Sequence, residues 1–561
     1  MIGRSFTTVL LFLLCLLGSA CSSGSQPDRH GTSTVTLAIT GTHASRLSQT
    51  ARSLMALHPI TTVQITISAE NMTTISWTGS ITPPATVTQA FTVPNGIGRT
   101  FLAQLLDASG AVAYEGSKTV DLDGGDVSLD ISVAPLFFTG TTLTGSAQRD
   151  EAMAVTVDSS GNIIIAGYTY GDLDGNLNSD ASHASPDVFV AKFDQYGEKL
   201  WTAETGSTGY DLAYGAATDS SGNIYIIGST DSRLDGQTNA GGADCFVTKY
   251  DAAGGKVWTR LIGGPDIDIG TGIAVDASGN VVITGYTYGD MVTSLGTFTN
   301  KDLSGLTTDL FVAKLGASDG ALIWLDLRGT PYHDQAEAIA VDGAGSIFVT
   351  GHTKGDLDNR INQAAVPGST SDLFLIKYTN GGVRQWTELL GTPDDDQAWA
   401  VAVDGGGNVS VAGGTWGSLD GNANTDLSGA TADAFVVTYD GGGNKLWSRM
   451  LGTPGNELAR GIALDASGNV YVTGSTRGSF TGFTNAGGYD VFAARYVPSS
   501  QTWLWTGEIG TSADENAYGI AIDKSGNAVI TGSTAGNFDA ITNAGSFDAF
   551  LMSYQQDGVK Q

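Results

Sequence analysis

The 561-residue chain is long enough for three or four ordinary domains, or for fewer if one of them is a large repeat fold. Its formal net charge of −30 argues against a partner that presents nucleic-acid phosphates or anionic lipid headgroups. A hydrophobic content of 41% excludes a disordered chain, and 77 glycines with only 15% charged residues favour strands joined by tight turns.

The first 21 residues have the pattern of a secretory signal. Arg4 precedes the apolar run Val9–Leu17, which is too short to span a membrane, and small residues follow it. A cysteine directly after small residues resembles the bacterial lipoprotein signal, and this resemblance implies that Cys21 becomes the lipidated first residue of the mature protein. It also implies a lipid-anchored protein of the bacterial cell envelope, at the outer membrane or the cell surface. The alternative is an ordinary secretory signal that contains a chance cysteine.

Residues 22–33 are predicted to form a polar linker, and residues 34–135 a small β domain. Apolar and polar residues alternate in short runs such as 34–40 (TVTLAIT) and 127–134 (VSLDISVA). This period of two predicts antiparallel strands with one buried face. About 100 residues with roughly seven strands suit a β-sandwich, similar in pattern to immunoglobulin-like spacer modules. We identify no chemical site here and interpret this domain as a spacer.

Residues 136–561 repeat one unit seven times. A turn with the pattern Asp-x-x-Gly recurs at intervals of 57 to 66 residues, and six of the units carry a Trp five residues before a Gly. The turn aspartates are Asp158, Asp219, Asp276, Asp342, Asp404, Asp465 and Asp523, and the tryptophans are Trp201, Trp258, Trp324, Trp386, Trp447 and Trp505. Each unit also holds an Asp-x-Phe motif, such as Asp187 and Phe189. Four predicted strands in about 60 residues are typical of one blade of a β-propeller.

Several phrases of the repeat are specific to one family. Residues 275–285 (VDASGNVVITG), 464–474 (LDASGNVYVTG) and 251–263 (DAAGGKVWTRLIG) closely resemble the bacterial β-propeller repeat called SBBP. The resemblance implies a seven-bladed ring. Because the last unit ends at Gln561 without its Trp strand, we expect 136–145 to complete that blade and close the ring. The predicted fold is therefore all-β: a seven-bladed β-propeller of four-stranded blades over 136–561, preceded by the small β-sandwich.

Every unit carries an acid eight residues before its turn aspartate. These acids are Asp150, Asp211, Asp268, Asp334, Asp396, Glu457 and Glu515. They fall in the connection that enters each unit, so we expect a ring of seven carboxylates at one mouth of the central channel, where they would attract cations or take part in ligand binding. The alternative is that each acid caps the backbone of the adjoining blade.

Two loops between the second and third predicted strands alternate oxygen-bearing side chains. The first carries Asp172, Asp174, Asn176, Asn178 and Asp180, and the other carries Ser418, Asp420, Asn422, Asn424 and Asp426. Ca²⁺ takes six to eight oxygen ligands from flexible loops of this kind, so both loops are predicted to bind calcium weakly. The alternative is a solvated polar turn.

Aromatic side chains are predicted on the same face. They are Tyr170, Tyr214, Tyr288, Trp399, Trp416 and Tyr518. Five residues before the turn aspartate the units differ, with Met153, Tyr214, Thr271, Glu337, Trp399, Arg460 and Tyr518 in turn. Positions that differ between otherwise similar units can carry specificity, and aromatic rings beside carboxylates and amides suit a sugar or a peptide. The alternative is packing at the rim.

Two classes of function remain. The first is a non-catalytic scaffold of the cell envelope that binds a surface protein or a glycan through one face of the propeller. The second is an envelope polysaccharide hydrolase or lyase that uses carboxylates of that face. The chain has six histidines, and His333 and His352 have no nucleophile spaced to either of them, so the sequence favours the non-enzymatic scaffold.

Overall fold

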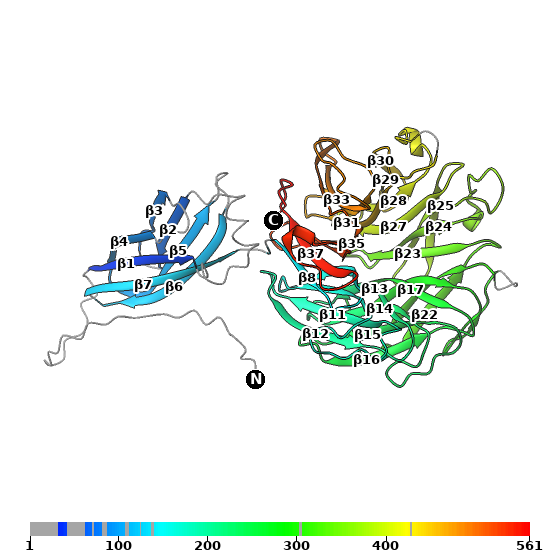
Figure 1. Ribbon diagram of the computed structural model, residues 1–561, viewed down its shortest axis with the longest axis horizontal. Coiled ribbons are helices and arrows are strands. Elements are labelled where there is room, and N and C mark those ends of the chain that lie inside the picture. Colours follow the sequence, from blue (N-terminus) through cyan, green and yellow to red (C-terminus); the bar gives the residue numbers. More distant parts are fainter. Residues whose placement is uncertain are drawn as a thin grey trace. The chain divides into compact units, whose positions relative to one another are not determined.

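The computed structural model describes residues 32–41, 62–69, 72–80, 87–106, 112–123, 125–135, 138, 140–301, 306–426 and 429–560. It comprises two compact units, Met1–Gly140 and Thr141–Gln561 (Figure 1). The predicted signal segment, Cys21 and the linker as far as residue 31 lie outside the described residues. Within the described part of the chain, no helix is long and apolar enough to cross a membrane.

The N-terminal unit is a β-sheet of seven strands, hydrogen-bonded in the order β3-β2-β5-β6-β7-β1-β4. The strands are β1 (Thr32–Gly41), β2 (Thr62–Ser68), β3 (Ile75–Ser80), β4 (Val87–Pro94), β5 (Gly96–Leu106), β6 (Val112–Leu122) and β7 (Gly125–Pro135). Alternate residues of β2 are buried, so Val63, Ile65 and Ile67 form a core with side chains of β4, β5, β6 and β7. The unit is all-β as expected, but β1 pairs with β7 in parallel, so the predicted antiparallel pairing is wrong for these two strands. The division of the unit into the two sheets of a sandwich stays a prediction.

The second unit contains seven four-stranded antiparallel sheets, numbered here in chain order. Sheets 1 to 3 are β9 (Asp150–Val157), β10 (Ile163–Thr169), β11 (Asp187–Phe193), β12 (Lys199–Thr205); β13 (Asp211–Thr218), β14 (Ile224–Thr230), β15 (Asp244–Tyr250), β16 (Lys256–Ile262); and β17 (Asp268–Val275), β18 (Val281–Thr287), β21 (Asp309–Leu315), β22 (Leu322–Arg328). Sheets 4 and 5 are β23 (Asp334–Val341), β24 (Ile347–Thr353), β25 (Asp372–Tyr378), β26 (Arg384–Leu390); and β27 (Asp396–Val403), β28 (Val409–Thr415), β29 (Asp433–Tyr439), β30 (Lys445–Leu451). Sheets 6 and 7 are β31 (Glu457–Leu464), β32 (Val470–Thr476), β33 (Asp490–Val497), β34 (Thr502–Ile509); and β35 (Glu515–Ile522), β36 (Ala528–Thr534), β37 (Asp548–Tyr554), β8 (Thr141–Thr144).

Short elements lie in the loops between second and third strands. They are the hairpin β19 (Met291–Thr293) and β20 (Gly296–Phe298) and the 3-10 turns η1 (Leu357–Asn359), η2 (Leu419–Gly421) and η3 (Phe538–Ala540). In each 3-10 turn the middle residue is an aspartate in the left-handed region, such as Asp420 with a φ of 53°.

The seven sheets follow one another around a closed ring (Figure 1). The first strand of each sheet contacts the first strand of the next, and β35 of sheet 7 contacts β9 of sheet 1. The fourth strand of sheet 7 is β8, which precedes all the others in the chain and pairs with β37 from Ala549↔Thr144 to Met552↔Thr141. The prediction that an N-terminal strand completes the last repeat is therefore confirmed for Thr141–Thr144. The all-β propeller architecture is confirmed as well.

A tryptophan joins most neighbouring sheets. Trp201 of β12 lies under the turn between the third and fourth strands of sheet 2, where a Cβ added to Gly254 would lie 3.0 Å from the indole ring. Because Gly254 also has a φ of +89°, only glycine fits this turn without strain. Equivalent contacts join Trp258 to Gly320, Trp324 to Gly382, Trp386 to Gly443 and Trp505 to Gly558. These contacts explain why the Trp and the turn glycine recur together.

A buried cation crosses the same junctions. Lys192 of β11 lies 2.9 Å from Asp158 of its own sheet and donates to the Ala252 carbonyl of the next sheet at 3.2 Å. Asp158 also accepts backbone N–H bonds within its turn, from Ser160 and Asn162. The turn aspartate therefore closes a hairpin and anchors a cross-sheet bond, which is the structural role expected of an Asp in such a turn.

Candidate binding site at the centre of the ring

Each first strand of the seven sheets contains a β-bulge at the same position. In sheet 6, β31 pairs with β32 at Ala459 and at Gly461, and Arg460 between them is left out of the ladder. A bulge of this kind re-aims the side chain of the extra residue. The bulged residues are Met153, Tyr214, Thr271, Glu337, Trp399, Arg460 and Tyr518. These are the same positions that differ from unit to unit in the sequence.

A glycine of the second strand faces each bulge. A Cβ added to Gly474 would lie 1.8 Å from the Leu458 carbonyl oxygen, so no other residue fits beside the bulged strand. Gly167, Gly228, Gly285, Gly351, Gly413 and Gly532 are in the same situation. The bulge therefore explains the glycine that ends each second-strand phrase of the repeat.

Bulged side chains of neighbouring sheets contact one another. The guanidinium carbon of Arg460 lies 4.3 Å from the centre of the Trp399 ring. Trp399 in turn lies against Gly414, where an added Cβ would meet the indole ring at 3.0 Å. On the other side of Arg460 in chain order, the Tyr518 hydroxyl donates to Glu151 Oε2 at 3.0 Å. Residues of sheets 5 and 6 are thus in contact at the bulges, and so are residues of sheets 7 and 1.

Charged bulge residues of non-adjacent sheets influence each other electrostatically. Burial raises the pKa of Glu337 to about 7, while the Arg460 guanidinium opposes this rise, although the two residues belong to sheets 4 and 6. Burial also lowers the pKa of Arg460, against the influence of Tyr518 and Glu337. His352 Nδ1 lies 3.9 Å from Glu337 Oε1, and burial lowers the pKa of His352 to about 4. Since the first strands of all seven sheets contact one another in turn around the ring and each of them carries a bulge, we infer that the bulged side chains meet at the centre of the ring.

The seven acids predicted to surround the channel mouth are buried without exposed surface. They are Asp150, Asp211, Asp268, Asp334, Asp396, Glu457 and Glu515. Each accepts a backbone N–H bond from the residue four positions earlier; Asp211 Oδ2, for example, accepts from the Ser207 N–H at 2.6 Å and from its hydroxyl at 2.7 Å. The backbone N–H of Asp396 donates to the Ser371 carbonyl of the preceding sheet at 2.7 Å. A ligand would reach these acids only if the covering loops moved, so their role in binding stays a prediction.

A second buried acid lies beside each of these acids. The aspartates of the Asp-x-Phe motifs each accept a backbone N–H bond that closes the preceding loop, as Asp244 does from Ala240 at 2.8 Å. Asp244 and Asp268 lie on either side of Gly263, where an added Cβ would be 2.6 Å from an oxygen of each. Burial, and secondarily the neighbouring carboxylate, raises the pKa of Asp268 to about 7. When two neighbouring carboxyl groups are shielded from solvent, the pKa of at least one of them is raised above its value in water.

The first loop predicted to bind calcium directs its oxygens to protein donors. Asp174, with a φ of 54°, accepts from Lys199 Nζ at 2.7 Å and from the Thr202 hydroxyl at 2.5 Å. The remaining oxygen-bearing residues also bond within the protein: Asp172 with the Asn178 N–H, Asn176 with the Leu173 carbonyl, Asn178 with the Thr169 carbonyl and Asp180 with the Ala184 N–H. The carboxylates therefore point to different partners.

The second predicted calcium loop is built in the same way. Asp420 binds Lys445 and accepts from the Ser448 hydroxyl at 2.6 Å. The other side chains bond as follows: Ser418 with the Asn424 N–H, Asn422 with the Leu419 carbonyl, Asn424 with the Thr415 carbonyl and Asp426 with the Thr431 N–H. Among the residues that the structure describes, no three acidic, His or Cys side chains gather as a metal site requires. Calcium binding stays a prediction. A bound ion would compete with Lys199 and Lys445 for the carboxylates of the two loops.

The predicted aromatic residues fall into two groups. Tyr214, Trp399 and Tyr518 occupy bulges and are half-buried. Tyr170, Tyr288 and Trp416 follow the ends of second strands. Among these, Tyr170 meets Tyr168 and Tyr288 meets Tyr286, each edge to face with ring centres 6.4 Å apart. Both groups lie where first strands begin and second strands end, at one end of the ring.

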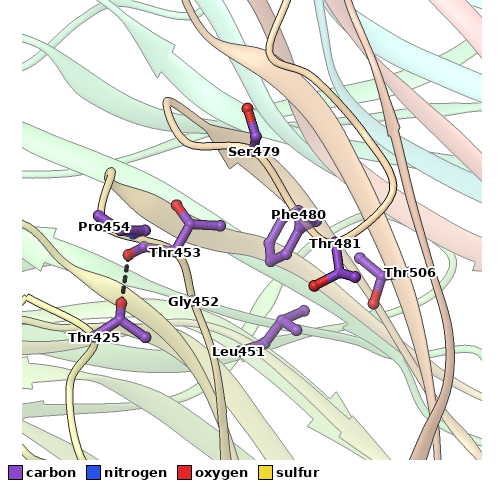
Figure 2. A pocket seen from close by; sticks show the side chains of 9 residues that line it. All are labelled: Thr425, Leu451, Gly452, Thr453, Pro454, Ser479, Phe480, Thr481 and Thr506. Atoms are coloured by element: carbon purple, nitrogen blue, oxygen red, sulfur yellow. Dashed lines mark hydrogen bonds between the residues drawn. The ribbon is translucent and has the colours of Figure 1, made fainter.

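A pocket of about 520 Å³ opens between sheets 5 and 6 at this end (Figure 2). It is lined by Thr425, Leu451, Gly452, Thr453, Pro454, Ser479, Phe480, Thr481 and Thr506. Figure 2 shows the Thr425 hydroxyl bonded to the Thr453 carbonyl, on the wall opposite the Phe480 ring. The volume suits a small ligand, and because no lining residue is titratable the pocket could bind a neutral group but not transfer a proton.

Sequence reasoning located the bulged positions but missed part of the group around them. Glu151, which is buried and accepts from Tyr518, follows one of the acids and shows no repeat pattern. Tyr168, Tyr286 and His352 stand between the glycine and threonine that end each second strand, where the other units have Ser or Gly. That variation between units was the available signal, and it is the same signal that marked the bulges.

The comparisons with known proteins agree with the repeat architecture. The SBBP family, described as "Beta-propeller repeat", matches residues 200–235, 257–290, 320–358, 446–481 and 504–539. The uncharacterized WD repeat-containing protein L264 of Acanthamoeba polyphaga mimivirus is 23% identical, over 73% of this chain and 38% of that protein. The regulatory protein FlaEY of Caulobacter vibrioides is 27% identical, over 60% of this chain and 38% of that protein. The chain thus spans about two fifths of the length of these relatives.

Among solved structures, the Pan2 WD40 domain of Neurospora crassa is similar with a TM-score of 0.39 and 8% identity. The similarity covers 73% of this chain and 91% of that domain.

Proposed function

This chain carries SBBP β-propeller repeats, and on that premise we propose that it is a non-catalytic binding protein of the bacterial cell envelope. Its seven sheets act as the seven blades of a propeller, and its N-terminal unit acts as a sandwich-like spacer. Lipid at Cys21 anchors the chain, and the partner is a surface protein or a glycan bound at the end of the ring that holds the bulges.

One observation carries this proposal: the residues that build each sheet and its turns recur in every unit, whereas the bulged residues differ from unit to unit. The glycines, turn aspartates and buried acids recur in every sheet, whereas the seven bulges present Met, Tyr, Thr, Glu, Trp, Arg and Tyr. A bulge has no partner in the ladder, so its side chain is free to serve something other than the sheet. A ring of different side chains on an identical frame suits recognition of one specific ligand.

The test is a binding screen with the full chain carrying Cys21→Ser, against glycans and surface proteins of bacterial envelopes. Tyr214→Ala, at a bulge, should weaken binding of any hit by about tenfold, in keeping with the loss of one aromatic contact of 1 to 2 kcal/mol. Tyr196→Ala is the matched control, because this tyrosine is 38% exposed in the turn between β11 and β12. Equal loss in both variants, or in neither, would contradict binding at the bulges.

A specific observation supports the enzymatic alternative. Glu337 has a pKa of about 7 and lies 3.9 Å from His352, so part of the population holds a proton that a general acid could donate at neutral pH. A hydrolase or lyase of envelope polysaccharide would release new reducing ends, and Glu337→Gln would abolish their release. Binding without any release of reducing ends favours the scaffold.

A further inference from the structure

We propose that Arg460, held against Trp399 at the centre of the ring, binds the carboxylate of an acidic sugar, so that the ligand is a glycan containing uronic acid. This inference rests on the proposed binding function and names its ligand class.

The first observation is that Arg460 is a cation without an acceptor. Its guanidinium makes no hydrogen bond and no ion pair with any described residue, and it lies over the Trp399 ring at 4.3 Å from the ring centre. Elsewhere in the ring most cations are bonded: Lys192 to Asp158 and Arg495 to Asp465, for example. Arg460 is half-buried, and five N–H donors taken partly out of water without acceptors are costly. A bound anion would satisfy them.

The second observation is that the guanidinium is already oriented. Trp399 covers one face of it, and Trp399 is itself fixed against Gly414, which leaves no room for a Cβ. Stacking on an aromatic ring occupies the flat face of an arginine and leaves the edge with its N–H groups free. That edge matches a carboxylate, which accepts two parallel N–H bonds.

A second arginine of sheet 6 repeats this arrangement at the rim. Arg477 follows the end of β32, is exposed, and stacks on the Tyr489 ring at 4.2 Å. Its side chain also makes no hydrogen bond or ion pair with a described residue. Two stacked arginines without a hydrogen-bonded or ion-paired partner on one sheet provide local positive charge for an anionic ligand, against the negative charge of the chain as a whole.

The carboxyl group of Glu337, whose charge acts on Arg460, does not prevent the binding of a ligand carboxylate there. Burial raises the pKa of Glu337 to about 7, so its carboxyl is partly protonated near neutral pH and can donate a hydrogen bond to an incoming carboxylate. Burial lowers the pKa of Arg460, and the Tyr518 and Tyr489 hydroxyls also act to raise it. Each of these groups can accept or donate a hydrogen bond.

The surroundings favour a sugar over an acidic peptide. Tyr214, Trp399 and Tyr518 offer aromatic surface for the C–H face of a pyranose ring. Gln335 and Gln397 follow the buried acids of sheets 4 and 5, are half-buried, and offer amide groups for hydroxyls. Apolar side chains that would anchor a peptide are rare at the bulges, where Met153 is the single aliphatic residue.

The experiment is calorimetric titration of the full chain carrying Cys21→Ser with galacturonate and glucuronate oligosaccharides. Neutral galactose and glucose oligosaccharides, inorganic phosphate and an acidic dipeptide serve as comparison ligands. We expect the uronates to bind, Arg460→Gln to weaken them at least tenfold, and Arg460→Lys to weaken them less, because lysine keeps the charge but loses the two-pronged edge. Arg449→Gln is the matched control, since Arg449 also stacks on an aromatic ring, Tyr496 at 5.6 Å, but belongs to the outer strand β30.

The melting temperature gives an independent readout. Removal of an unpaired, half-buried cation should leave it unchanged or raise it in Arg460→Gln, whereas loss of a structural arginine would lower it. Uronate binding that survives Arg460→Gln, or Arg460-dependent binding of the dipeptide or of phosphate without the uronates, would overturn this inference. If neutral glycans or a protein bind and depend on Tyr214 but not on Arg460, the proposed binding function stands and the acidic-sugar inference falls. If nothing binds, both fall.

Discussion

Six junctions of the ring differ in construction from the seam between sheet 7 and sheet 1. At the six, a Trp of the fourth strand packs on the following sheet, as Trp324 does with its Nε1 donating to the Asn380 carbonyl at 3.3 Å. At the seam the fourth strand is β8, and Gly140 stands at the Trp position with a φ of 111°. Ser553 of β37 stands where five of the other third strands carry a Lys or Arg, such as Lys192, and Thr438 of β29 is the second position without this cation.

The seam is held instead by a charged network at the end of the ring where the bulges lie. Arg149 of sheet 1 lies 4.9 Å over the Phe547 ring of sheet 7 and donates to Glu151 at 2.5 Å. Glu151, which is 1% exposed, also accepts from Tyr518 of sheet 7. The difference shows that the seam combines the packing of β9 on sheet 7 with four paired residues of β8 and one buried carboxylate, in place of the Trp that serves the other junctions.

The largest effect is expected from removal of the closing strand. Deletion of 141–144 exposes the bare edge of β37, and an unpaired edge is a template for association with other chains. We expect loss of the monomer in size-exclusion chromatography and a lower, broader melting transition. Deletion of four exposed or half-buried loop residues, 365–368, is the control and should leave the chain monomeric. A monomeric 141–144 deletion with unchanged melting would show that β8 does not close the ring.

Single substitutions should separate the two kinds of junction. Trp386→Ala removes an indole that packs on Gly443 and donates to Gly441, and should cost about 3 kcal/mol of unfolding free energy. Glu151→Ala leaves Arg149 and Tyr518 without their acceptor and should cost about 2 kcal/mol. Hydrogen exchange should rise in sheets 4 and 5 for the first variant and in β8 and β9 for the second. The same exchange pattern in both would remove the distinction between seam and junction.

The buried acid pairs are common to all seven junctions, and they predict a pH dependence. Burial raises the pKa of Asp268 and Asp334 to about 7 and that of Asp211 and Asp396 to about 6. A raised folded-state pKa contributes stability that is complete below the unfolded pKa and is lost as pH rises through the folded value. The melting temperature should therefore be higher at pH 5 than at pH 8.

Asp268→Asn should reduce that difference, since an amide cannot ionise; one pKa unit corresponds to about 1.4 kcal/mol. The control is Asp235→Asn, because Asp235 forms a partly exposed ion pair with Lys256 at 2.6 Å and belongs to none of the acid pairs. Melting that is unchanged between pH 5 and pH 8 would mean that both carboxyls of each pair ionise freely.

The smallest effect is expected from calcium. If the loops at 172–180 and 418–426 bind it weakly, millimolar Ca²⁺ should raise the melting temperature slightly and EDTA should reverse the rise. Asp174→Ala with Asp420→Ala should remove the response. Asp235→Ala is the matched control, because Asp235 also has a positive φ and a lysine partner but lies in a loop with only three alternating oxygen-bearing side chains, where Arg233 and Gly241 take the places of Asp172 and Asp180. A calcium response that this control also loses would not come from those oxygens.

The repeat made much of the ring predictable. The recurring Trp positions could be predicted from the sequence. So could the need for an N-terminal strand in the last sheet, because comparison of the seven units shows that the unit of Asp548 is the one without a fourth strand. The bulges could not be read, since a residue left out of a ladder has no local signature; only the variation at Arg460 and its equivalents marked them. Whether Asp211 and its equivalents were exposed or capped could not be decided either, because that depends on Ser207 and on loops folded over them.

An alanine scan of the seven bulged residues tests the central claim most directly, with affinity for a bound glycan and the melting temperature measured on each variant. The account predicts that Arg460→Ala and Trp399→Ala lose at least tenfold in affinity while Leu200→Ala, an exposed residue of the outer strand β12, loses none. It also predicts that the loss of affinity does not follow the change in melting temperature. Undiminished affinity across all seven bulge variants would contradict the claim that the ring binds its ligand there.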